Sequence, residues 1–206
     1  MYRGHMPSVP GGIYGLCNQV AVAFSGQKLT VIDMGSRHGE GFVEFGTHFD
    51  CHYEFVEPSP RCLPKIEDVI RENPGRSFRL HSGVMGGQPG SIILNVFESD
   101  GDQSANVFSD RQGRYGRSEQ VTVPVIPYDE MLSCYDIAKI NIEGGEYQLL
   151  DDNVFDRFGT FVMEAHNQHV KGKNYQTLIE GLQDKFDIFS YGNLMYKYCF
   201  LVGLRV

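Results

Sequence analysis

The most constraining feature of this 206-residue chain is an alternation of short apolar runs with segments of helical periodicity, which begins near residue 29. Short apolar runs are typical of buried strands, and apolar residues at three- and four-residue spacing are typical of amphipathic helices. Such alternation predicts an α/β fold with a mostly parallel sheet and helices on both of its faces. In sheets of that kind, ligands bind beyond the carboxyl ends of the strands.

The pattern predicts the following elements. We expect strands at 29–34, 53–56, 77–81, 136–142 and 159–165, helices at 40–49, 63–72, 146–158 and 175–186, and a terminal hairpin from strands at 187–191 and 196–204. Residues 1–28 carry no strong pattern and are expected to form an N-terminal segment or cap, in which a short amphipathic piece is a candidate helix. The rest of the chain, 29–206, is expected to be a single domain.

An insert interrupts the alternation in the middle of the chain. Strand-like runs at 91–97 and 120–126 flank a polar stretch at 98–119 that contains three glycines and three arginines. We interpret residues 90–127 as a β-hairpin insert. A connection as long as 98–119 is usually functional or disordered.

Composition and charge exclude several classes of protein. With 18 Lys+Arg against 26 Asp+Glu, the formal net charge is −8, which disfavours a general nucleic-acid or anionic-membrane binder. There is no apolar run of membrane-spanning length and no signal-peptide pattern, so we expect a cytoplasmic location. The five cysteines are odd in number and contain no C-x-x-C pair, which argues against a disulfide framework and a zinc site. No metal site is expected, and the oligomeric state is not readable.

A turn with two glycines follows the first expected strand. Asp33 precedes Gly35, and Gly39 follows four residues later; glycine allows the backbone to approach a ligand closely at such a turn. The dinucleotide-binding fingerprint instead requires three glycines that seat a pyrophosphate at a helix N-terminus. Here an acid stands where it would repel phosphate, and its charge suits a cationic or amine-bearing ligand.

The second expected strand ends at an acid, Glu57. A carboxylate at this point of such a fold can accept hydrogen bonds from the hydroxyls of a ribose. A glycine turn and a second-strand acid together indicate a nucleoside ligand. The acid before the glycine turn favours S-adenosylmethionine over NAD, because S-adenosylmethionine carries an ammonium and a sulfonium and no phosphate.

Polar residues recur along two later strands, in the segments KINIEGGE and MEAH. Strand alternation places Lys139, Asn141 and Glu143 on one face of the first strand, and Glu164 and His166 on one face of the second. If the two strands are neighbours, these five groups gather near the carboxyl end of the sheet. Lys139 lies too deep in an apolar strand to be left unpaired, and we expect Glu164 to be its partner in a buried structural pair.

These segments resemble the FkbM family of S-adenosylmethionine-dependent methyltransferases, which has the Rossmann-like class I methyltransferase fold. The matching stretches are VIDMGSRHGE (31–40), FVEPSP (55–60), KINIEGGEYQLL (139–150) and VMEAH (162–166). The first two are generic to class I methyltransferases, and the last two are more specific to the family. The resemblance implies a seven-stranded sheet whose last strand is antiparallel, with S-adenosylmethionine as the cofactor.

We therefore expect a set of cofactor contacts at the ends of the first three strands. They are Asp33, Gly35, Ser36 and Gly39 after the first strand, Glu57 and Pro58 after the second, and Ser82 after the third. The third strand lacks the acid that many class I enzymes place against the adenine, so Ser82 and the backbone are expected to serve there. The family pattern K-x-D-x-E-G is broken at Asn141, which cannot act as a base and is a poorer metal ligand than Asp.

The predicted activity is transfer of a methyl group to a hydroxyl oxygen of a small molecule or sugar. Because the sulfonium methyl is already activated, most of the catalysis is in-line positioning of the acceptor. A hydroxyl must also lose its proton, and the predicted catalytic residues are His166 as general base, Glu143 as second candidate, and Asn141 beside them.

Structural alternatives and other functions stay open at this point. His166 is equally explained as a hydrogen-bonded strand-end histidine, and Glu143 as a cap of the following helix. Glu146 is expected to be an ordinary acid of the first helical turn. A nicotinamide-dependent oxidoreductase and a non-catalytic module that binds the cofactor or a partner protein are the competing functions.

Overall fold

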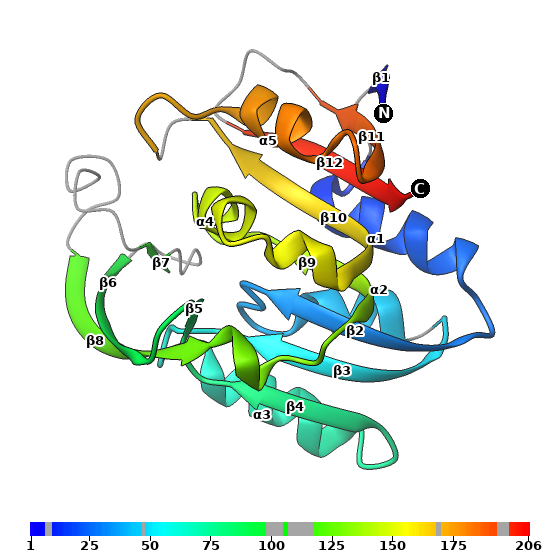
Figure 1. Ribbon diagram of the computed structural model, residues 1–206. Helices are drawn as coiled ribbons and strands as arrows, with labels where there is room; N and C mark the ends of the chain where they lie inside the picture. Colours follow the sequence, from blue (N-terminus) through cyan, green and yellow to red (C-terminus); the bar gives the residue numbers. More distant parts are fainter. Residues whose placement is uncertain (7–9, 47, 98–104, 107–117, 168–169, 193–197) are drawn as a thin grey trace.

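The computed structural model describes residues 1–6, 10–46, 48–97, 105–106, 118–167, 170–192 and 198–206 (Figure 1). The strands are β1 (Tyr2–Met6), β2 (Lys28–Met34), β3 (Asp50–Val56), β4 (Ser77–His81), β5 (Val84–Gly86), β6 (Gly90–Phe97), β7 (Ala105–Asn106), β8 (Ser118–Pro127), β9 (Tyr135–Ile140), β10 (Phe158–His166), β11 (Phe186–Tyr191) and β12 (Tyr198–Arg205). The helices are α1 (Gly12–Ala23), α2 (Glu40–Gly46), α3 (Leu63–Glu72), α4 (Glu146–Asp151) and α5 (Tyr175–Leu182), with the short 3-10 helices η2 (Tyr128–Glu130) and η3 (Val154–Arg157).

The main sheet has the strand order β1-β11-β12-β10-β9-β2-β3-β4. β12 runs antiparallel to both of its neighbours, while β10, β9, β2, β3 and β4 are parallel to one another. The predicted mostly parallel sheet with an antiparallel last strand is therefore confirmed. The number of seven strands is wrong, because β1 adds an eighth strand beside β11. Its mostly exposed residues lack the apolar alternation that would have revealed it.

Helices cover both faces of this sheet, as predicted. One apolar core joins the sheet to α1, α2 and α3, through residues such as Leu16, Phe45 and Ile66. The other joins it to α4, η3 and α5, through residues such as Leu149 and Leu178. Figure 1 shows the two groups of helices on opposite sides of the strands.

The insert forms a second sheet of order β5-β8-β6-β7. β6 and β8 pair antiparallel, as the sequence predicted, and β5 adds a parallel strand to β8 that was not predicted. Figure 1 shows β6 and β8 curving together beside the end of the main sheet at which the parallel strands finish. Most of the predicted 98–119 loop lies outside the described residues.

Three helices end earlier than their periodicity indicates. α2 ends at Gly46 rather than residue 49, and α5 ends at Leu182 rather than 186. The helix expected at 146–158 is broken by Asn153, whose left-handed backbone (φ 57°) separates α4 from η3. Asparagine tolerates that conformation better than most residues, so the apolar spacing continued while the helix did not.

A buried polar network ties three strands together, and the sequence analysis missed it. The carboxylate of Glu54 on β3 accepts hydrogen bonds from Tyr135 Oη (2.8 Å) and from the rings of His81 (2.8 Å) and His52 (3.1 Å). Burial opposes ionisation of Glu54, but these donors outweigh it and hold the pKa of the carboxyl below its ordinary value. The network therefore joins β3 to its neighbour β4 and, across β2, to β9, and its contribution to stability depends on the ionised form of Glu54.

Glu54→Gln is expected to lower the free energy of unfolding at pH 7 by about 1–3 kcal/mol, because buried donors lose their charged acceptor. The stabilisation is present above the ordinary glutamate pKa and is lost as the pH falls through the lower folded-state value, so the deficit of the variant shrinks in acid. Urea denaturation of the variant and the wild type at pH 7 and pH 4 measures the loss of stability and its decrease in acid. Glu67→Gln, the same change at an exposed position of α3, is the control; an equal effect of the two variants would contradict the assignment.

Candidate active site

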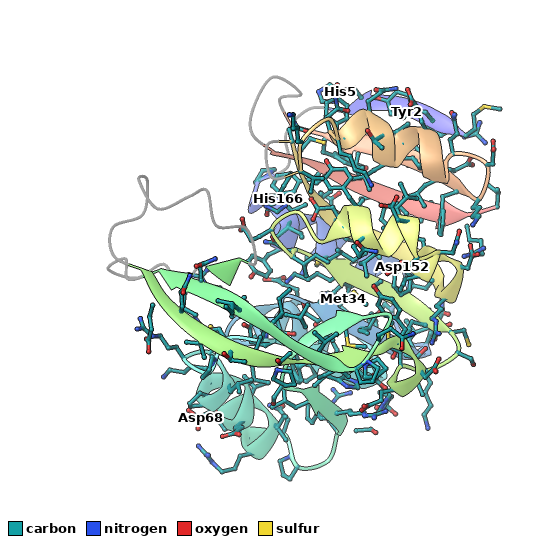
Figure 2. The ribbon with its side chains drawn as sticks, turned by 60° about the vertical axis from the view of Figure 1, so that its left-hand side comes forward. Tyr2, His5, Met34, Asp68, Asp152 and His166 are labelled. Carbon is teal, nitrogen blue, oxygen red and sulfur yellow. The ribbon has the colours of Figure 1, made fainter. Side chains whose placement is uncertain are left out.

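A cavity of about 660 Å³ lies beyond the carboxyl ends of the central strands. The lining residues come from most of the elements that end at this edge. They belong to α1 (Ile13, Tyr14), to the ends of β2 and β3 (Met34, Gly35, Arg37, Val56, Glu57, Pro58), to the second sheet and its neighbours (Gly83, Val84, Met85, Gly86, Ile92, Leu94, Val125, Tyr128), to the β9–α4 turn (Asn141–Gly145), to α4 (Tyr147, Gln148, Leu149, Asp151), to β10 (Glu164) and to the segment before α5 (Val170, Lys173). Met34 and His166 are the last residues of β2 and β10 and mark this edge of the sheet in Figure 2. The ligand position predicted from the fold thus coincides with a real cavity.

The first glycine turn forms one wall of the cavity, as predicted for Gly35. Gly35 has φ 78°, and a Cβ atom at this position would lie 1.9 Å from the carbonyl oxygen of Asn141. Its amide donates to Val56 O (2.9 Å), and the Asn141 amide donates to Met34 O (2.9 Å). The ends of β2, β3 and β9 therefore meet so closely at this turn that only glycine fits. Gly39, with φ 84°, packs against Val69 and does not line the cavity among the described residues.

Asp33 is fully buried below this turn, and it pairs with Lys139. Lys139 Nζ lies 2.9 Å from Asp33 Oδ1 and donates to Gly35 O at 2.6 Å. Tyr53 Oη donates to Asp33 Oδ2 at 3.0 Å. Burial opposes the charge on Lys139, but the neighbouring Asp33 raises the lysine pKa well above its ordinary value. Asp33 does not line the cavity among the described residues, so its position supports the glycine turn from behind.

The predicted pairing of Lys139 with Glu164 is wrong. Lys139 lies directly opposite Asp33 in the register of β9 and β2, whereas its register partner on β10 is Val162. Glu164 lies two residues further along β10, beside Asn141. It accepts a hydrogen bond from Asn141 Nδ2 at 3.1 Å.

Two of the other expected cofactor residues also face away from the cavity. Ser36 is buried, donates to Asp33 O (2.6 Å) and accepts from the Val56 amide (3.0 Å), so its hydroxyl holds the turn together. Ser82 is exposed, and its neighbours Gly83 and Val84 line the cavity in its place.

Glu57 and Pro58 line the cavity where they were expected. The Glu57 carboxylate is 5% exposed and accepts hydrogen bonds from the amides of Arg37 (2.8 Å) and Ser59 (2.7 Å). Burial raises the pKa of Glu57 to about 7 despite these amides. Two backbone donors thus orient a carboxylate at the cavity wall, and its ionisation changes near neutral pH.

The predicted polar cluster forms around His166, with four of its five expected members. Glu143 lines the cavity in a left-handed backbone conformation (φ 54°). Glu143 Oε1 and Glu164 Oε1 lie 3.7 and 3.6 Å from His166 Nε2. Asn141 joins the cluster through Glu164, and Lys139 is the member that lies elsewhere.

Glu146 lies in the first turn of α4, as predicted, and is also a fifth member of this cluster, which was not predicted. It is fully buried and accepts hydrogen bonds from the amides of Gly144 (2.8 Å) and His166 (2.6 Å). Its Oε1 atom also lies 3.2 Å from His166 Nδ1. Its place directly after the Gly144-Gly145 pair, at the start of α4, is the only sign of this role in the sequence.

The site fits S-adenosylmethionine by its donors and acceptors. Within the described residues, Asn141 Oδ1 is buried at the cavity and has no hydrogen-bond partner. A buried hydrogen-bond acceptor without a partner lowers the stability of the protein unless a ligand donates a hydrogen bond to it. The carboxylates of Glu57 and Glu143, which also line the cavity, suit a ligand with ribose hydroxyls and an ammonium.

Comparisons with known proteins agree with this geometry. The family model described as Methyltransferase FkbM domain matches residues 33–191. No curated protein matches the chain. Within the described residues, no group of three or more His, Cys, Asp or Glu could hold a metal ion, and no helix is long and apolar enough to cross a membrane.

Several solved structures share the fold at low sequence identity. Precorrin-6y C5,15-methyltransferase from Geobacter metallireducens GS-15 has a TM-score of 0.55 and 13% identity, covering 92% of this chain and 86% of that one. Ribosomal protein L11 methylase from Lactobacillus delbrueckii subsp. bulgaricus has a TM-score of 0.55 and 11% identity, covering 94% and 77%. Methyltransferase FkbM from Methylobacillus flagellatus KT has a TM-score of 0.52 and 12% identity, covering 85% and 43%, so this chain spans less than half of that protein.

The fold is that of the class I methyltransferases. Within that class the chain belongs to the FkbM methyltransferase family, whose model covers most of its length. Its cofactor is S-adenosylmethionine, as in the class as a whole.

Lys139→Met is expected to destabilise the fold by about 3–5 kcal/mol, because it leaves the buried Asp33 carboxylate without its countercharge. The double variant Asp33→Asn with Lys139→Met removes both charges and is expected to recover much of this loss. Urea denaturation of the single and double variants measures the coupling. Losses that simply add in the double variant would show that the two groups do not form a pair.

Proposed function

We propose that this methyltransferase transfers its methyl group to a hydroxyl oxygen of a small molecule or sugar. When bound, S-adenosylmethionine supplies a methyl group that its sulfonium has already activated. The protein must then hold an acceptor in line with that methyl group and receive the proton that the acceptor loses. We assign the binding of the cofactor ribose to Glu57, and the positioning of the acceptor to the wall formed by Asn141, Glu143 and Glu164.

Glu57 is the residue proposed to hold the ribose. Its carboxylate keeps lone pairs for ligand hydroxyls in addition to the two backbone amides that orient it. Pro58 beside it and Met85 from the insert offer apolar surface to a base. The Gly35 turn allows the chain to approach the rest of the cofactor closely.

The observation that carries the hydroxyl proposal is the chemistry of the cavity wall formed by Asn141, Glu143 and Glu164. The carboxylates of Glu143 and Glu164 accept hydrogen bonds, and the buried Asn141 Oδ1 is an acceptor without a partner within the described residues, while the Asn141 amide nitrogen donates to Glu164. Such a wall favours an acceptor molecule that donates hydrogen bonds, as a hydroxyl does, and disfavours a phosphate or carboxylate. The named acceptors of the related structures differ, from a precorrin to a ribosomal protein, so our choice rests on this wall.

Calorimetry separates the proposed activity from a nicotinamide-dependent one. We expect S-adenosylhomocysteine to bind with a measurable heat and NADH or NADPH to give none, because no three-glycine phosphate loop is present and acids line the cavity. A measurable heat of binding with NADH, together with no heat of binding with S-adenosylhomocysteine, would contradict the proposal.

The affinity for S-adenosylhomocysteine is expected to rise with pH through about 7, the value to which burial raises the Glu57 pKa. Below that pH the carboxyl is protonated and loses acceptor capacity for the ribose hydroxyls. Calorimetric titrations from pH 5.5 to 8.5 measure the trend. Glu57→Gln should bind more weakly at pH 8 and show a flat profile between these limits; a variant that keeps the wild-type slope would remove Glu57 from the ribose site.

Methyl transfer itself is tested with S-adenosylmethionine labelled in its methyl group and a panel of monosaccharides, methyl glycosides and polyhydroxylated small molecules. We expect label on an oxygen of at least one compound, located by mass spectrometry and NMR. Binding of the cofactor with no labelled product from any compound would favour a non-catalytic module.

A further inference from the structure

The ring of His166 faces a carboxylate at each of its two nitrogens. Nδ1 lies 3.2 Å from Glu146 Oε1, and Nε2 lies 3.6–3.7 Å from Glu164 and Glu143. Ionised carboxylates only accept hydrogen bonds, so each ring nitrogen that faces one is favoured in its N–H form. A neutral ring would leave one nitrogen lone pair directed at negative oxygens. The geometry therefore favours the doubly protonated imidazolium.

Within the described part of the chain, the charged groups that face His166 agree with this reading. Glu143 comes from the β9–α4 turn, Glu146 from α4 and Glu164 from β10 itself, while Cys199 of β12 carries a neutral thiol because burial raises its pKa to about 12. Burial of the ring opposes its charge, but the carboxylates outweigh that effect and raise the pKa of His166 to about 9. An imidazolium has no lone pair with which to accept a proton.

The carboxylates of Glu143 and Glu164 and the ring of His166 differ in their access to the cavity. Glu143 and Glu164 line the cavity, whereas His166 is absent from the described lining and only 3% exposed. An acceptor hydroxyl in the cavity therefore meets a carboxylate before it meets the imidazole.

Glu164 is better placed than Glu143 to take the proton. It lies on the central strand β10, where neighbours on both sides fix the backbone, and Asn141 Nδ2 orients its Oε2 atom at 3.1 Å. Burial raises the pKa of Glu164 above its ordinary value, even though His166 opposes the shift, and a carboxylate of raised pKa is a stronger base. Glu143 belongs to a turn instead.

We infer that Glu164 is the general base, that Asn141 orients its carboxylate, and that His166 acts as a fixed positive charge beside it rather than as the base. This inference rests on the proposed hydroxyl methylation. The acceptor oxygen forms a bond to the methyl carbon as the carbon–sulfur bond breaks, and that electron pair stays on sulfur. The hydroxyl proton passes to the Glu164 carboxylate. Asn141 is suited to its positioning role because, unlike Asp, it offers an N–H to that carboxylate.

The protonation state of His166 is tested without an acceptor. In ¹⁵N NMR spectra of the full chain bound to S-adenosylhomocysteine, His166→Gln identifies the ring signals. We expect both ring nitrogens to stay protonated at pH 7 and to titrate near pH 9. A ring that titrates at its ordinary value near 6.5 or below would overturn the inference, whatever the outcome for the proposed function.

The base is tested with the panel compound that is methylated fastest. Glu164→Gln should lower kcat at least about 100-fold while the Kd for S-adenosylhomocysteine stays within about two-fold, since general bases contribute about 10²–10⁴ in rate. Glu164→Asp, which keeps a shortened carboxylate, should retain part of the rate and guards against misfolding of the first variant. Glu180→Gln, the same change at an exposed position of α5, is the matched control and should match wild type.

The positioning residues are tested by the pH profile of kcat. Asn141→Leu and His166→Gln should each keep an acid limb and move it to higher pH, because both remove stabilisation of the Glu164 carboxylate. If His166 were the base, His166→Gln would abolish the limb and Glu164→Gln would keep it. That result would overturn the inference while leaving methyl transfer itself established. If no panel compound is methylated, the proposed function fails and the NMR titration alone decides the state of His166.

Discussion

The buried ion pair between Asp33 and Lys139 is the interaction on which the rest of the site depends. It joins β2 to β9 in the middle of the sheet, and the same ammonium holds the carbonyl oxygen of Gly35. The Gly35 turn then lies against the backbone of Asn141, so the wall of the cofactor cavity and the start of the acceptor wall are fixed together. Burying two charges is expensive unless they are paired and hydrogen-bonded. Tyr53 completes the set of partners that makes this arrangement possible.

Three carboxylates gather at the end of β10, and the buried ring of His166 lies between them. Glu143, Glu146 and Glu164 would repel one another at this edge of the sheet without His166 between them. Glu146 in turn ties the β9–α4 turn to the end of β10 through two backbone amides. The net charge of the chain is mostly a property of its surface, whereas this local excess of carboxylates suits a cofactor that carries a sulfonium and an ammonium.

Local signals in the sequence were sufficient for the sheet, the glycine turn and Glu57, because each depends on residues close together in the chain. The partner of Lys139 was not readable, because it depends on the register of two strands that are about a hundred residues apart. The Glu54 network has the same origin. β1 was missed because an exposed edge strand is held by backbone pairing and lacks apolar alternation. The roles of His166 and Glu146 required the distances between three elements that no spacing rule supplies.

A crystal structure of the complex with S-adenosylhomocysteine tests the central claim most directly, since it locates the sulfur relative to the two ends of the cavity. The account predicts that the ribose hydroxyls donate to Glu57, that the sulfur lies beyond the Gly35 turn, and that the side from which the methyl group would project faces Asn141 and Glu164. A sulfur that faces away from Glu164, or a ribose that does not contact Glu57, would contradict it.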